Sequence, residues 1–177
     1  QFRMRFTITL ILARALSREH ATRLLVPNDP DEARGPAGDL EVVGAPAGRL
    51  AEAARGSSAA VVSGHAANSW FHEVPGLPVA VDLYDPFPIE NLTYFRTLGD
   101  GPYRHDRMTF ERQLRQGDLF LCSSPEQRLF YLGMLYALGR LNPETYFADF
   151  TLANLVREVP FGIAPPEPAA VDGAAAP

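Results

Sequence analysis

The amino-acid sequence predicts an α/β fold: an open, doubly wound, mostly parallel sheet that forms a single Rossmann-like domain. Short apolar segments alternate with helical segments along most of the chain, an order typical of right-handed β-α-β crossovers. The strand segments are nearly all apolar, as expected for strands that helices cover on both faces. The 177 residues, 46% hydrophobic and 21% charged, are enough for about one soluble domain with its own core.

The first half of the chain contains the clearest helical pattern. Residues 6–18 carry apolar side chains at the i, i+3, i+4 spacing of a helix, and the polar stretch NDPDEARGPAGD over residues 28–39 is rich in turn formers and predicts an exposed loop. The remaining elements expected in this half are strands over residues 21–27, 40–44 and 59–64 and a short helix over residues 47–56.

The second half continues the alternation. Apolar runs predict strands and longer segments between them predict helices. In chain order these are a strand over residues 78–86, helices over 88–98 and 103–116, a strand over 119–123, a helix over 125–140, a helix over 149–155 and a strand over 156–163. We place the domain at residues 1–164 and expect residues 165–177, rich in Pro and Ala, to be a flexible tail or the start of a linker.

Composition narrows the class of function. The net charge of −5 argues against a nucleic-acid partner, and all 16 basic residues are arginine. The single Cys122 excludes an internal disulfide and a cysteine-based zinc site. No apolar run is long enough for a membrane span and no signal peptide is visible, so we expect a cytoplasmic protein. Arg14 and Arg18 on the first helix allow contact with a membrane surface, but a solvated face is the preferred interpretation.

Candidate site residues gather where predicted strands end, because open α/β sheets bind ligands at the carboxyl ends of their strands. Asp85 falls at such an end and Glu90 near the start of the next helix, which suits proton transfer or hydrogen bonding to a polyol. An equally good interpretation is a turn at Asp85-Pro86 with Glu90 near a helix amino terminus. Asp82 lies inside the strand and needs a buried partner, for which we expect an arginine.

The stretch CSSPEQ places polar groups between a strand and a helix. The free N–H groups and positive dipole of a helix amino terminus can hold a ligand hydroxyl or phosphate, which makes Ser123, Ser124 and Gln127 candidates. The preferred alternative is a capping box in which Ser124 is the N-cap, Pro125 the first helical residue and Gln127 the return contact.

Histidine and aromatic residues add one candidate. His65 follows the strand at residues 59–64 and lies at the same sheet edge, although a packed or capping histidine is the commoner role. Trp70 fits core packing better than sugar stacking. We predict no metal site, because His72-Glu73 does not begin an H-E-x-x-H motif and His20 and His105 lie far apart in the sequence. We also predict no cofactor, and no G-x-G-x-x-G, Walker or G-x-S-x-G motif is present.

Several segments, taken together, resemble the amino-terminal domain of GT-B glycosyltransferases of the family 4 group. The segment GLPVAVDLYDPFPIE looks like the family's strand that ends in an aromatic residue or His followed by Asp. The segment FERQLRQGDLFLCSSPEQRLFYLGMLYALGR is similar to its helix, strand, Ser turn and long helix, and LVREVPFGI is similar to its interdomain strand. RFTITLILARALSREHATRLLVP is similar to the first helix and second strand. The resemblance covers roughly residues 5–164.

The resemblance implies transfer of a sugar from a nucleotide-sugar donor to an acceptor between two Rossmann-like domains. It identifies this chain as the acceptor-side domain, with the donor held by a carboxyl-terminal domain that this chain lacks, and it implies a first strand before the first helix. Tyr84 and Asp85 match the pair at the strand end, with Asp85 as the candidate catalytic residue. Ser123 and Gln127 match the polar turn that lines the cleft. The family's partners would be a sugar or glycan acceptor and a nucleotide sugar, and the isolated chain is expected to be inactive.

Two other functions stay open. A non-catalytic Rossmann-like binding or interaction module has the same sheet, since fold does not imply function. A small nucleotide-dependent hydrolase or reductase ranks third, because no phosphate-binding loop is present in the sequence.

Overall fold

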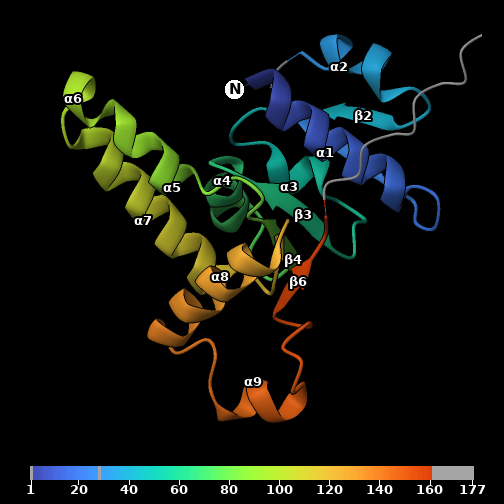
Figure 1. The fold of residues 1–177 in the computed structure, drawn as a ribbon. Coiled ribbons are helices and arrows are strands. Elements are labelled where there is room, and N and C mark those ends of the chain that lie inside the picture. Colours follow the sequence, from blue (N-terminus) through green and yellow to red (C-terminus); the bar gives the residue numbers. More distant parts are fainter. Residues whose placement is uncertain (1, 28, 161–177) are drawn as a thin grey trace, which may run out of the picture.

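The structure, a computed structural model, describes residues 2–27 and 29–160 and has an α/β architecture with parallel strands (Figure 1). Helices and strands alternate along the chain as the sequence predicts. The helices are α1 (Phe2–Leu16), α2 (Asp31–Ala37), α3 (Leu50–Ala53), α4 (Ala66–Glu73), α5 (Phe87–Glu90), the 3-10 helix η1 (Asn91–Tyr94), α6 (Phe95–Leu98), α7 (Gly101–Gln116), α8 (Pro125–Ala137) and α9 (Pro143–Ala148). The strands are β1 (Arg23–Val26), β2 (Glu41–Gly44), β3 (Ala60–Ser63), β4 (Val79–Asp82), β5 (Leu119–Cys122) and β6 (Val156–Glu158).

The strands form two sheets, whereas the sequence predicted one. β1 pairs with β2, and a separate sheet has the order β3-β4-β5-β6, with every pairing parallel. No strand among the described residues lies between β1 and β3 to join the two sheets. One edge of β1 and one edge of β3 are therefore unpaired. The β1–β2 pair has its own small core beneath α1, which includes Leu10, Leu24 and Val26. Leu25 faces the other way and packs against the same buried cluster around Trp70 as Ala60 of β3, so the two sheets are neighbours.

The four-stranded sheet is covered much better on one face than on the other. Its strand order follows the chain order, so successive right-handed crossovers leave their helices on the same face. Val81, Phe120 and Val156 lie side by side on that face and pack with the core residues of α5, α7 and α8. On the opposite face Asp82 is only half-buried and Arg157 is exposed. The prediction that helices cover both faces is confirmed only in part for this sheet, because on the second face Leu121 is buried and Thr9 of α1 lies beside Asp82, while Arg157 stays exposed.

Three local predictions also differ from the structure. Part of the expected loop at residues 28–39 is the helix α2, which begins with two acidic residues that favour a helix amino terminus and buries Ala33 and Ala37. The helix expected at residues 149–155 lies earlier, as α9, where Asn142 and Thr145 form a capping box. α4 was not predicted, although Trp70 within it is buried as expected.

The turn from α7 into β5 is tightly fixed. The guanidinium of Arg140 donates to the carbonyl oxygens of Leu114, Arg115 and Gly117 at 2.7–3.1 Å, which satisfies backbone acceptors at the end of the helix. A Cβ on Gly117 would lie 2.7 Å from Cγ2 of Val81, so only glycine fits this close approach. This turn holds the amino ends of β4 and β5 together, at the sheet edge opposite the candidate site.

Some predicted features lie outside the described residues. They are the end of the last predicted strand, including Phe161 and Gly162, and the predicted tail over residues 165–177.

Candidate functional site

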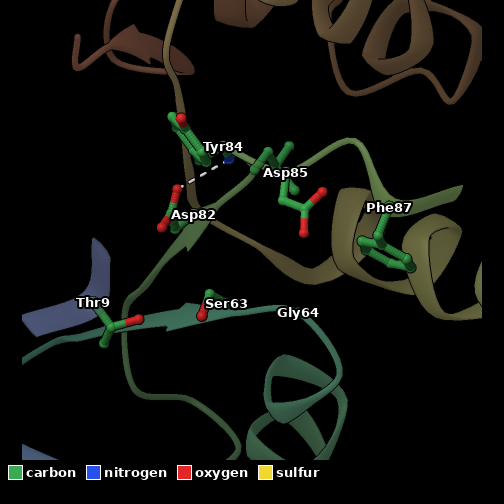
Figure 2. Close-up of a pocket in the computed structure, with 8 residues that line it drawn as sticks. Thr9, Ser63, Gly64, Asp82, Tyr84, Asp85 and Phe87 are labelled. Atoms are coloured by element: carbon green, nitrogen blue, oxygen red, sulfur yellow. Dashed lines mark hydrogen bonds between the residues drawn. The ribbon is translucent and has the colours of Figure 1, made fainter. Parts of the chain in front are cut away.

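The carboxyl ends of β3 and β4 meet a residue of α1 around a small pocket (Figure 2). Its volume is about 30 Å³, which is room for one or two water molecules rather than a sugar ring. Asp85 and Tyr84, both predicted site residues, line it, as does the unpredicted Thr9. The full lining consists of Thr9, Ser63, Gly64, Asp82, Leu83, Tyr84, Asp85 and Phe87.

Asp82 is the acidic group whose surroundings are best defined. Its Oδ1 accepts a hydrogen bond from the backbone N–H of Tyr84 at 3.0 Å, which bends the chain as it leaves β4. Burial raises the pKa of Asp82, the Tyr84 N–H opposes that shift, and the nearby Asp85 carboxylate adds to it. The prediction that an arginine faces Asp82 is wrong, because no arginine among the described residues forms an ion pair with it. A carboxyl with a raised pKa in a pocket is suited to exchange a proton with a ligand hydroxyl.

Asp85 lies on the other side of the chain from Asp82. Figure 2 shows its carboxylate directed toward Phe87, away from Asp82 and Tyr84. Glu90 ends α5 one helical turn later; it is exposed and does not line the pocket. The structure thus brings Asp85 to the site and leaves Glu90 at its margin.

Gln127 ties the loop after β4 to the loop after β5. Its Nε2 donates to the carbonyl oxygen of Tyr84 at 2.9 Å, and its Oε1 accepts from both the N–H and the hydroxyl of Ser123 at 2.9 Å. Nearby, the buried Tyr131 hydroxyl donates to the carbonyl oxygen of Leu83 at 2.6 Å. These contacts use the polar groups of Gln127 to position the strand ends.

Ser124 is the N-cap of α8, as predicted. Its hydroxyl accepts from the N–H of Gln127 at 3.3 Å, and Pro125 occupies the first helical position. The return contact of the predicted capping box is different, because the Gln127 side chain reaches the N–H of Ser123 and not that of Ser124. The turn is therefore built by capping, and its contact with a ligand stays a prediction.

His65 belongs to a cluster that sequence analysis missed. Its Nε2 lies 3.5 Å from Oδ1 of Asp106 on α7, and its ring stacks on His105 with centroids 5.1 Å apart. Asp106 is 4% exposed, and its Oδ2 accepts from Asn91 Nδ2 at 2.7 Å. The sequence contained a sign that Asp106 is buried, because Asp106 lies four residues before the apolar Phe110 and so on the same face of the helix.

The described residues contain neither a cluster suited to a metal ion nor a helix suited to span a membrane. No three His, Cys, Asp or Glu side chains among them gather closely enough to hold a metal ion. Within residues 2–27 and 29–160, no helix has the length and apolar character needed to cross a membrane.

Comparison with known proteins adds no assignment. The chain matches no protein-family model, no curated protein and no solved structure.

Proposed function

We propose that this chain is the acceptor-side domain of a glycosyltransferase, which places an acceptor hydroxyl for attack on a nucleotide-sugar donor. The observation that carries the proposal is the grouping of Asp82, Tyr84 and Asp85 around one pocket at the carboxyl end of a central parallel strand. Carboxylates at such an edge suit hydrogen bonding to a polyol, and open α/β sheets bind ligands there. The sequence resemblance to GT-B transferases gives the reaction class.

In this proposal Asp85 contacts the reacting hydroxyl, and Tyr84 and His65 help to bind the acceptor. Ser123, Ser124 and Gln127 shape the cleft, and Glu90 lies at its rim. The donor is held by a second domain, so the isolated chain binds acceptor without turnover, because it lacks the contacts that stabilise the transition state. The pocket of about 30 Å³ must widen to admit a sugar ring. The proposal includes a cytoplasmic location, which rests on the sequence alone.

Binding measurements on the 177-residue chain test the proposal. Calorimetry or ligand-observed NMR with a panel of sugar acceptors and a panel of nucleotide sugars should detect acceptor binding only. Asp85→Ala should weaken that binding at least about tenfold in a protein that stays folded, and Glu144→Ala, an exposed acid on α9, is the matched control. Tight nucleotide binding without acceptor binding would contradict the proposal and favour a nucleotide-dependent hydrolase or reductase.

One observation favours a second candidate, a non-catalytic interaction module. A groove of about 460 Å³ lies between α5, η1, α7 and α8 and is lined mostly by apolar side chains. Exposed apolar surface of this kind is common where proteins bind partners. Absence of binding in both ligand panels, with the chain folded, would favour this candidate.

A further inference from the structure

The cluster of His65, Asp106 and Asn91 has the arrangement of a carboxylate that orients an imidazole. Asp106 comes from α7 and is almost fully buried, and its two oxygens face two different groups, His65 Nε2 and Asn91 Nδ2. The Asn91 amide fixes the carboxylate from one side. The Oδ1 oxygen is thereby directed at the imidazole, at a distance of 3.5 Å.

Packing holds the ring itself in place. Phe87, which lines the sheet-edge pocket, lies with its centroid 5.3 Å from the His65 ring, and His105 stacks on His65. Even so, 47% of the His65 side chain is exposed, whereas 6% of the Asp106 side chain is. A buried acid and an accessible imidazole thus lie next to the pocket that Asp85 lines, and Gly64, the residue before His65, is part of the pocket lining.

The 3.5 Å contact between Asp106 Oδ1 and His65 Nε2 favours one tautomer of the neutral imidazole. A carboxylate facing Nε2 favours a proton on Nε2, which leaves Nδ1 as the basic nitrogen of the ring. The carboxylate also stabilises the imidazolium that forms when Nδ1 takes up a proton, as the acid of a Ser-His-Asp triad does. His65 therefore has the properties of a proton acceptor, and Asp106 those of the residue that positions it.

We propose that His65 is the catalytic base of this site and that Asp106 is its positioning residue, an inference that rests on the proposed transferase function. The acceptor hydroxyl oxygen forms a bond to the anomeric carbon of the nucleotide-sugar donor. The bond from that carbon to the diphosphate oxygen breaks, and its electron pair leaves with the nucleotide diphosphate. The hydroxyl proton passes to His65 Nδ1, and the resulting imidazolium faces Asp106. Asp85 then binds the acceptor rather than accepting its proton.

The test measures the imidazole directly and needs no substrate. Nitrogen NMR of the folded chain should show neutral His65 with its proton on Nε2. Diethyl pyrocarbonate reacts with the unprotonated imidazole nitrogen, and mass spectrometry gives its rate at each histidine. Asp106→Asn should lower the rate at His65 about tenfold, because a charge-assisted contact to the ring is lost. His20, which is exposed on a loop, serves as the internal reference.

Asp100→Asn is the matched control, since Asp100 is an exposed acid at the start of the same helix and pairs with Arg104. It should leave the His65 rate unchanged within about twofold. A proton on Nδ1 in the wild-type chain overturns the inference even if Asp106→Asn fails to fold, and so does an equal His65 rate in folded Asp106→Asn. If the dyad behaves as expected and no sugar acceptor binds, the transferase proposal fails while the reactive imidazole remains.

Discussion

Two hollows of this domain lie on either side of the turn after β4 and differ in volume and polarity. Phe87 lines the sheet-edge pocket, while its neighbours Pro86 and Pro88 line the groove. The pocket holds about 30 Å³ and contains two carboxylates, whereas the groove holds about 460 Å³ and has mainly apolar walls. The smaller hollow contains the ionisable side chains, and the larger one has the volume of a ligand site.

The two hollows differ in volume because the polar groups around them form different numbers of hydrogen bonds. At the sheet edge, the carbonyl of Tyr84 accepts from Gln127 of α8 and the carboxylate of Asp82 accepts from the N–H of Tyr84, so hydrogen bonds hold the chain around the pocket. In the groove the floor is formed by Phe110 and Leu114, and the prolines offer no N–H donors to draw a wall inward. Hydrogen bonds between segments keep the sheet-edge pocket small, whereas the groove has few such bonds and stays open.

The largest expected effect concerns the floor of the groove. Leu114 is fully buried and belongs to the main core, so Leu114→Ala should lower the free energy of unfolding by about 3 kcal/mol through lost burial and a cavity. Leu92→Ala, on a wall of the same groove and 50% exposed, should cost less than about 0.5 kcal/mol. Denaturant unfolding measures both. Similar losses of unfolding free energy in the two variants would mean that Leu114 does not contribute more to the core than Leu92.

Gln127→Leu should have the next largest effect. The change leaves the Tyr84 carbonyl and the Ser123 N–H without their side-chain partner, at a cost of about 1–2 kcal/mol because both are partly buried. Thermal unfolding gives the loss, and faster amide exchange at Ser123 would locate it. Gln116→Leu, an exposed glutamine at the end of α7, is the control. A loss equal to that of the control would mean that Gln127 does not hold the pocket closed.

The groove should bind an apolar dye in the native state. Anilinonaphthalene sulfonate has an apolar ring system and an anionic group, and Arg107, which lines the groove, has no ion-pair partner among the described residues. Ala137→Phe fills the groove from the end of α8 and should weaken dye binding about fivefold. Ala148→Phe adds the same side chain to the end of α9, outside the groove. Dye affinity that is equal in both variants would place the binding elsewhere.

The smallest effect is a change in pH dependence at the polar pocket. Because burial raises the pKa of Asp82, the folded chain binds that proton more tightly than the unfolded chain. Between the ordinary Asp pKa, about 3.9, and the raised value, stability therefore falls as pH rises. Asp82→Asn should remove this fall: the variant should be more stable than wild type near neutral pH, and the difference should vanish below about pH 4.

Glu73 should change stability with pH in the direction opposite to Asp82, because its pKa is lowered. Backbone N–H groups of Gly48 and Leu50 lower its pKa, so its contribution to stability is present above the ordinary Glu pKa and is lost as pH falls through the lowered value. Glu73→Gln should therefore destabilise the chain at neutral pH and converge with wild type in acid. Melting temperatures measured across pH distinguish the two variants. A pH-independent effect of Asp82→Asn would mean that Asp82 is not desolvated.

The sequence predicted local features better than the contacts between distant segments. Apolar runs predicted each strand found within residues 2–27 and 29–160, and Ser124-Pro125 predicted the start of α8 from a signal confined to neighbouring residues. The division into two sheets and the unequal cover of the two faces depend on which strand edges meet, which no local pattern encodes. His65 and Asp106 come together only because α4 packs against α7. Asn142-Pro143 marks the start of α9 in the same way as Ser124-Pro125 marks the start of α8. The sequence prediction nevertheless placed that helix later in the chain.

The division into two sheets also bears on how the domain opens. The β1–β2 unit is held by a few medium-sized side chains and several alanines, whereas the four-stranded sheet encloses Phe87, Phe120 and Tyr131. Units with such unequal cores open with different free energies. Hydrogen exchange should therefore separate the amides into two cooperative classes, with β1 and β2 exchanging well before β4 and β5. This chain would then lose its small sheet as one folding unit while the polar edge at β4 stays intact.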